Sequence, residues 1–132
     1  MTQDQASVST EDRDDYEFIS AKTKDGRTVV VARSRVWWVK AQRDFLRLHT
    51  ETGETYLRRG TLKGLEQRWA KHGFVRIHKS YLVFLPRARE LRLGGWGWVL
   101  TVGSGAGAIE LPVGRKRVPQ LRQLLKAKTA PE

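Results

Sequence analysis

Short segments rich in β-branched and aromatic residues, separated by turns that often contain glycine, run through most of this sequence. Such side chains pack well on a pleated, half-buried surface, so each segment predicts a β-strand. Arg87, Arg89 and Arg92 also alternate with leucines in a strand-like pattern. Together these segments predict a mainly β domain of about eight to ten strands. The clearest strand segments are residues 18–22, 28–32, 36–41, 45–49, 55–59, 81–85, 98–102 and 108–113.

Helical periodicity is present in two short windows. Leu62, Leu65 and Trp69 share one helical face, Thr61 can cap the start, and Gly73 suits a left-handed helix end, which predicts a helix over about 61–72. The second window predicts a short C-terminal helix, with Pro119 tolerated in its first turn. Its apolar stripe consists of Val118, Leu121, Leu124 and Leu125.

The charge of the chain is unevenly distributed. The net charge is +11, but the first 17 residues carry six acidic and one basic side chain, so residues 18–132 carry +16. We expect residues 1–16 to form a disordered acidic tail, residues 17–127 a folded domain and residues 128–132 a second tail. A body this basic favours a polyanionic partner, with nucleic acid ahead of a membrane surface. The acidic tail is either a solubilising segment or a competitor of DNA for the basic face.

Several function classes lack their usual signals. The chain has no cysteine and its three histidines lack metal-site spacing, so neither a metal nor a cofactor is expected. Residues 103–107 lack the lysine of a phosphate-binding loop, and Asp44 with His49 forms no defined catalytic set, so no enzyme activity or small-molecule substrate is expected. No apolar run has the ~18–20 residues of a membrane span, and the N-terminus is no secretory signal. We expect a cytoplasmic protein with no membrane partner.

Cationic side chains gather at three points where strands end. Arg76, His78 and Lys79 directly precede an apolar strand, Arg115, Lys116 and Arg117 follow the last strand, and Arg43 lies in a strand connection. Loops braced by a rigid sheet could hold these charges against phosphates and base edges without a helix-turn-helix. Ordinary solvated basic loops would explain any one of these groups, but they explain two groups and a charge of +16 less well.

The five tryptophans suggest an alternative function. Trp38 and Trp69 lie at periodic positions and are expected in the core, whereas Trp37, Trp96 and Trp98 are candidates for the surface. Aromatic side chains among cations can stack on the bases of single strands or contact a protein partner. The alternative is therefore a protein-binding or RNA-binding module that uses a basic surface rich in tryptophan.

Three stretches closely resemble the LytTR domain, the DNA-binding domain of LytR/AlgR-type bacterial transcription regulators. They are TLKGLE at residues 61–66, FVRIHKSYLV at 74–83 and LPVGRKR at 111–117, and the likeness runs from about residue 28 to 126. The resemblance implies an elongated fold of short antiparallel β-sheets with a short central and a short C-terminal helix. It also implies that loops enter successive major grooves of double-stranded DNA, commonly with a second protomer on a paired repeat.

The resemblance also assigns residues. Lys79 and Arg115 fall where the family places DNA-contacting side chains, and a third contact comes from the loop of Arg43 and Asp44. By their chemistry, Arg115 suits a guanine edge and Lys79 a phosphate or groove acceptor. Lys116 and Arg117 support them, while Arg76 and His78 serve either the contact or the structure.

The chain departs from the family pattern in two residues and in its organisation. It has Phe84 where the family usually has Asn, and Gly114 in place of Ser. Family regulators, many of them two-component-like, usually carry a receiver or sensory domain ahead of this one. The sequence is therefore either a stand-alone regulator or a piece of a longer protein.

Overall fold

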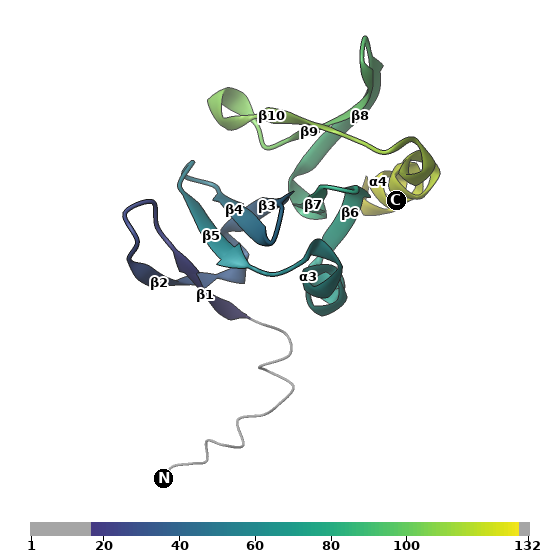
Figure 1. The fold of residues 1–132 in the computed structure, drawn as a ribbon. Helices are drawn as coiled ribbons and strands as arrows, with labels where there is room; N and C mark the ends of the chain where they lie inside the picture. Colours follow the sequence, from purple (N-terminus) through teal and green to yellow (C-terminus); the bar gives the residue numbers. More distant parts are fainter. Residues whose placement is uncertain (1–16, 130–132) are drawn as a thin grey trace.

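The structure is a computed structural model, and it describes residues 17–129 (Figure 1). The expected acidic tail, with its suggested competition against DNA, lies outside these residues, and so do residues 130–132. Within residues 17–129, seven strands form one antiparallel sheet in the order β2-β1-β5-β4-β3-β7-β6, and three form a second sheet in the order β10-β9-β8. The mainly β fold predicted from the sequence is confirmed.

The strand bounds agree closely with the predicted segments. The large sheet contains β1 (Phe18–Lys22), β2 (Thr28–Ala32), β3 (Val36–Gln42), β4 (Phe45–Thr50), β5 (Thr55–Arg59), β6 (Phe74–His78) and β7 (Tyr81–Phe84). The small sheet contains β8 (Ala88–Gly94), β9 (Gly97–Val102) and β10 (Ile109–Pro112). The expectation of a cationic loop ahead of the strand at residue 81 was wrong for its first part. Residues 74–78 form strand β6, so Arg76 and His78 lie on that strand and Lys79 alone of that group lies in the turn.

Two short helices lie where periodicity predicted them. Helix α3 (Leu62–Trp69) is capped by Thr61, whose Oγ1 accepts a hydrogen bond from the Gly64 amide at 3.1 Å. It continues as the short 3-10 helix η2 (Ala70–His72) and ends at Gly73, whose φ of +93° places it in the left-handed region that glycine adopts without strain. Helix α4 (Val118–Thr129) extends two residues past the predicted domain end at residue 127.

The strands β3, β6 and β7 have a hydrophobic core on each face. Neighbouring residues of a strand point to opposite faces, so Leu82 of β7 belongs to the first core and Val83 to the second. Helix α3 covers the first face, and the small sheet with α4 covers the second (Figure 1). The first core consists of Ile19, Ala21, Val31, Val36, Val39, Leu46, Leu48, Leu62, Leu65, Trp69, Phe74 and Leu82. The second consists of Ile77, Val83, Ala88, Leu100, Val102, Leu111, Val113, Val118 and Leu121.

The tryptophans differ in burial more than the sequence indicated. Trp69 is fully buried, as expected, while Trp38 is only half-buried and packs against the second core. Trp37 and Trp98 are also half-buried, and the guanidinium groups of Arg87 and Arg122 lie 5.1 and 5.5 Å from their respective rings. Trp96 is the one fully exposed tryptophan, at the turn between β8 and β9. The five indoles therefore do not form a shared stacking surface.

Candidate nucleic-acid interface

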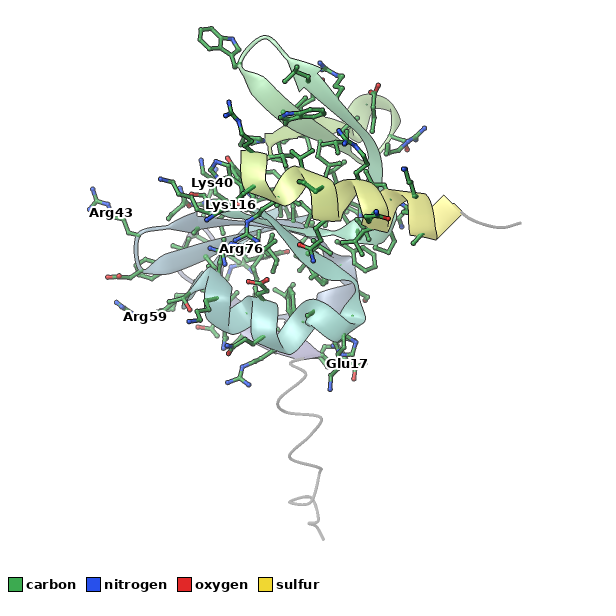
Figure 2. The ribbon with its side chains drawn as sticks, turned by 90° about the vertical axis from the view of Figure 1, so that its right-hand side faces the viewer. Glu17, Lys40, Arg43, Arg59, Arg76 and Lys116 are labelled. Atoms are coloured by element: carbon green, nitrogen blue, oxygen red, sulfur yellow. The ribbon has the colours of Figure 1, made fainter. Side chains whose placement is uncertain are left out.

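The three predicted cationic sites come together at one end of the large sheet. They lie in the β3–β4 turn, in the β6–β7 turn and in the short 3-10 helix η5 (Arg115–Arg117) that precedes α4. Two backbone hydrogen bonds connect them: the Ala41 amide donates to the Ser80 carbonyl at 2.9 Å, and the Gly114 amide donates to the Ile77 carbonyl at 2.7 Å. Figure 2 shows Arg43, Lys40 and Lys116 on the same side of the molecule.

The β6–β7 turn is held by the guanidinium group of Arg76. Its Nε donates to the His78 carbonyl at 2.9 Å, and one terminal nitrogen donates to the Lys79 carbonyl at 2.7 Å. The other terminal nitrogen forms an ion pair with Glu66 of α3 at 3.2 Å. Because the side chain of Arg76 is only 16% exposed and its donors point inward, it fixes the turn from which Lys79 projects.

His78 closes the same turn from its other side. Its Nδ1 accepts a hydrogen bond from the Ser80 amide at 3.0 Å, so the neutral ring carries its proton on Nε2. Burial lowers the pKa of His78, and the positive charges of Lys79, Arg117 and Arg76 lower it further. His78 therefore presents a neutral N–H donor beside three cationic side chains.

A groove separates the β6–β7 turn from η5. It is lined by His78, Lys79, Gly114, Arg115, Lys116 and Arg117. The side chains of Lys79, Arg115 and Lys116 are exposed, and within residues 17–129 none of them forms a hydrogen bond or an ion pair. These cations are therefore available for an external anion. A Cβ at Gly114 would make only ordinary contacts, 3.8 and 3.9 Å from Ile77 and His78, so the space would also admit a serine.

The β3–β4 connection is a two-residue turn of Arg43 and Asp44, since Gln42 pairs with Phe45. Arg43 has a φ of +58°, and it is the one non-glycine residue with positive φ between residues 17 and 129. This conformation costs an L-amino acid about 1–2 kcal/mol, and such strained residues are common at functional sites. Both side chains of the turn are exposed.

Sequence reasoning missed two further cations beside these turns. Lys40 pairs in register with Tyr81, and its ammonium lies 5.8 Å from the Tyr81 ring. Arg59 pairs with Phe45, and its guanidinium group lies 5.0 Å from that ring. Figure 2 shows both on the same side of the molecule as Arg43. These two cations could have been found from the pairing of the hairpin strands. That pairing places the end of β5 and the end of β3 next to the β3–β4 turn.

Asp44 and His49 do not form an acid–base pair. Asp44 directly precedes β4 and His49 lies near its end, five residues further along an extended chain, which corresponds to about 16 Å. His49 instead stacks on Trp38, with ring centroids 3.5 Å apart and an interplanar angle of 6°. Its Nε2 is buried and has no hydrogen-bond partner in the part of the chain that the structure describes.

His49 is expected to make the stability of the domain depend on pH. Burial, with the nearby charges of Arg47 and Lys40, lowers the pKa of His49 from 6.5 to about 4. The unfolded chain then binds the proton more tightly, so the contribution of His49 is complete above pH 6.5 and decreases as the pH falls towards 4. Urea unfolding at pH 7.5 and pH 5 should show a smaller loss of stability for His49→Phe than for the original chain. An equal loss in both would contradict this assignment.

Residues 17–129 contain neither a helix able to span a membrane nor a cluster of metal ligands. No helix in this range combines the length and apolar character needed to cross a lipid bilayer. The same residues contain no group of three or more His, Asp and Glu side chains placed to hold a metal ion.

Comparisons with known proteins agree with this geometry. The LytTr DNA-binding domain family matches residues 26–126. The chain is 35% identical over 98 residues to the CO-responsive transcriptional regulator RcoM of Rhodospirillum rubrum, which covers 74% of this chain and 41% of that regulator. The chain thus spans less than half the length of this relative. A solved LytTr DNA-binding domain from Bacillus cereus has the same fold, with a TM-score of 0.68 and 22% identity over 83% of this chain and 96% of that one.

Proposed function

This chain belongs to the LytTr DNA-binding domain family, and we propose that it recognises specific double-stranded DNA sequences through three cationic turns. The observation that carries this proposal is the position of these turns. Three segments far apart in the sequence meet at one end of the sheet, and their exposed cations have no partner within residues 17–129. Such turns can enter successive major grooves along one face of a duplex.

The exposed cations divide into base-reading and phosphate-binding roles. Arg115 projects from η5 with both terminal nitrogens available, which suits bidentate hydrogen bonds to O6 and N7 of guanine. Lys79 at the β6–β7 turn suits a phosphate or a groove acceptor, and Lys116 and Arg43 suit phosphates. Arg117 is half-buried and contributes charge beside the groove.

Arg76 and His78 have different roles from these cations. The guanidinium group of Arg76 is committed to two backbone carbonyls and Glu66, so we assign it to holding the turn rather than to contacting DNA. His78 keeps Nε2–H as a donor, which can reach a phosphate or a base acceptor next to Lys79.

Regulation of transcription is the second part of the proposal. The relative from Rhodospirillum rubrum is a transcriptional regulator, and this chain corresponds to 41% of it. The proposal also includes a second protomer. Residues 17–129 supply one set of the three turns, so a paired DNA repeat would need a second copy of the chain for its other half. The alternative module based on tryptophans receives less support, since only Trp96 is fully exposed.

The proposal is tested by measuring binding to duplex DNA, single-stranded DNA and RNA of equal length across a series of salt concentrations. Duplex DNA should bind most tightly, and selection from a random duplex pool should yield a motif, in paired copies if two protomers bind. A steep salt dependence without a motif would reduce the interaction to phosphate binding, because counterion release carries no sequence information. Preferred binding to single strands would contradict the proposal.

A further inference from the structure

The chain from β6 to the start of β8 is hydrogen-bonded at two places to the chain from Gly114 to the end of α4. At one of these places lie the two cationic turns, linked by the hydrogen bond from the Gly114 amide to the Ile77 carbonyl. At the other lies Lys128, in the last turn of α4. Its ammonium donates to the carbonyls of Leu85, Pro86 and Ala88 at 3.1, 3.1 and 2.9 Å. Leu85 and Pro86 lie in the connection between β7 and β8, and Ala88 is the first residue of β8.

The donors of the Lys128 ammonium match the carbonyl acceptors around it in number. A lysine ammonium has three N–H donors, and the chain from Leu85 to Ala88 offers three carbonyl acceptors grouped around one position. The connection contains the 3-10 helix η3 (Leu85–Arg87), whose end is closed by a hydrogen bond from the Ala88 amide to the Leu85 carbonyl, so Lys128 adds a second donor to that oxygen. A cation in the last turn of α4 also interacts favourably with the negative end of the helix dipole.

The apolar contacts of α4 are concentrated near its start. Val118 and Leu121 are buried in the second core, and Leu125 is only partly buried against it. Beyond Leu125, the ammonium of Lys128 hydrogen-bonds the last turn of α4 to backbone carbonyls between β7 and β8 and at the start of β8. The direction of the helix therefore depends on apolar packing at one end and on this ammonium at the other.

We propose that Lys128 is a positioning residue for DNA binding. By tying the end of α4 to η3, it fixes the direction of the helix and hence the place of Arg115–Arg117 relative to Lys79. This inference rests on the proposed function, because it concerns the same cationic turns. Ten residues of helix separate Lys128 from Val118, which corresponds to about 15 Å, so Lys128 acts from outside the interface.

The test compares Lys128→Gln with Lys24→Gln in the full chain. Both substitutions remove one positive charge, and Lys24 lies in the exposed β1–β2 turn. The selected duplex should bind Lys128→Gln roughly tenfold more weakly than Lys24→Gln, which corresponds to about 1.4 kcal/mol. The slope of log affinity against log salt should be the same for both, because Lys128 touches no phosphate. Hydrogen exchange of the Gly114 and Arg117 amides should be faster in Lys128→Gln without DNA.

Three results would overturn the inference. The first is equal affinity of the two variants, and the second is a salt slope reduced by about one unit only in Lys128→Gln, which marks a lost phosphate contact. The third comes from Lys128→Arg, which keeps the charge but has a planar fork that cannot direct three donors to one cluster of carbonyls. Lys128→Arg should also weaken binding and speed the hydrogen exchange of the Gly114 amide. If its duplex affinity and its Gly114 exchange rate both equal those of the original chain, the inference is overturned.

The same variants separate this inference from the proposed function. If Lys128→Gln does not fold, the comparison rests on Lys128→Arg. If the original chain shows no preference for duplex DNA, the proposed function fails. The hydrogen exchange at Gly114 and Arg117 then still reports whether Lys128 fixes η5.

Discussion

Arg115→Ala is expected to weaken binding to the preferred duplex by about 1–3 kcal/mol, a factor of roughly 5 to 150, and to relax the preference at one base pair. The side chain is exposed at the start of η5, beside the groove that Lys79 lines, and has no internal partner within residues 17–129. Its loss should leave stability nearly unchanged. The measurement is the affinity for a panel of duplexes in which each base pair of the motif is replaced in turn.

The control for this prediction is Arg27→Ala. Arg27 lies in the remote β1–β2 turn, where its Nε forms an exposed ion pair with Asp25 at 3.1 Å, and its loss should change neither affinity nor base preference appreciably. Arg76→Ala should weaken binding to all sequences alike, because the turn that presents Lys79 loses its support. If Arg115→Ala also weakens all sequences equally, Arg115 contacts a phosphate rather than a base.

Trp69→Ala is expected to lower the free energy of unfolding by about 3–5 kcal/mol, as large truncations in well-packed cores do. Trp69 is 0% exposed, and its ring lies 4.7 Å from that of Phe74, where α3 packs on the large sheet. Domains have only about 5–15 kcal/mol of stability in total, so this loss would be a large part of it. Urea unfolding curves of the variant and the original chain measure the difference.

Trp96→Ala provides the matched control. It removes the same indole from a fully exposed position, so its effect on stability should stay within about 0.5 kcal/mol. If the two variants were destabilised equally, the burial of Trp69 could not be the reason for its effect.

Local elements of the fold could be predicted because neighbouring residues specify them. The Asp25-Gly26 hairpin, the Thr61 cap and the left-handed Gly73 each depend on contacts within a few residues. The order of strands in the sheet could not be predicted, because it depends on pairings between distant segments. Strand β1 pairs with its neighbour β2 but also with β5, and the β1–β5 register consists of Lys22 with Leu57. The half-burial of Trp38 was missed for a related reason, since the register of β3 shifts between Val36 and Trp38.

For the interface, the sequence could indicate the types of side chain but not their partners. The exposed cations of the β6–β7 turn and η5 stand out because they lie directly at strand ends. That Arg76 supports the turn depends on Glu66, which lies on a different element. Two of the three carbonyls that bind Lys128, those of Leu85 and Pro86, lie more than forty residues away from it in the sequence. No local pattern could therefore reveal these hydrogen bonds.

The two cores on opposite faces of shared strands make the domain a single cooperative unit. Leu82 of the first core and Val83 of the second are consecutive residues of β7. If one core unfolds, the other therefore loses the packing of that strand. The cationic turns are the ends of these same strands. A bound duplex is therefore expected to raise the unfolding midpoint of the whole domain, in proportion to the logarithm of the DNA concentration, rather than to protect one segment locally.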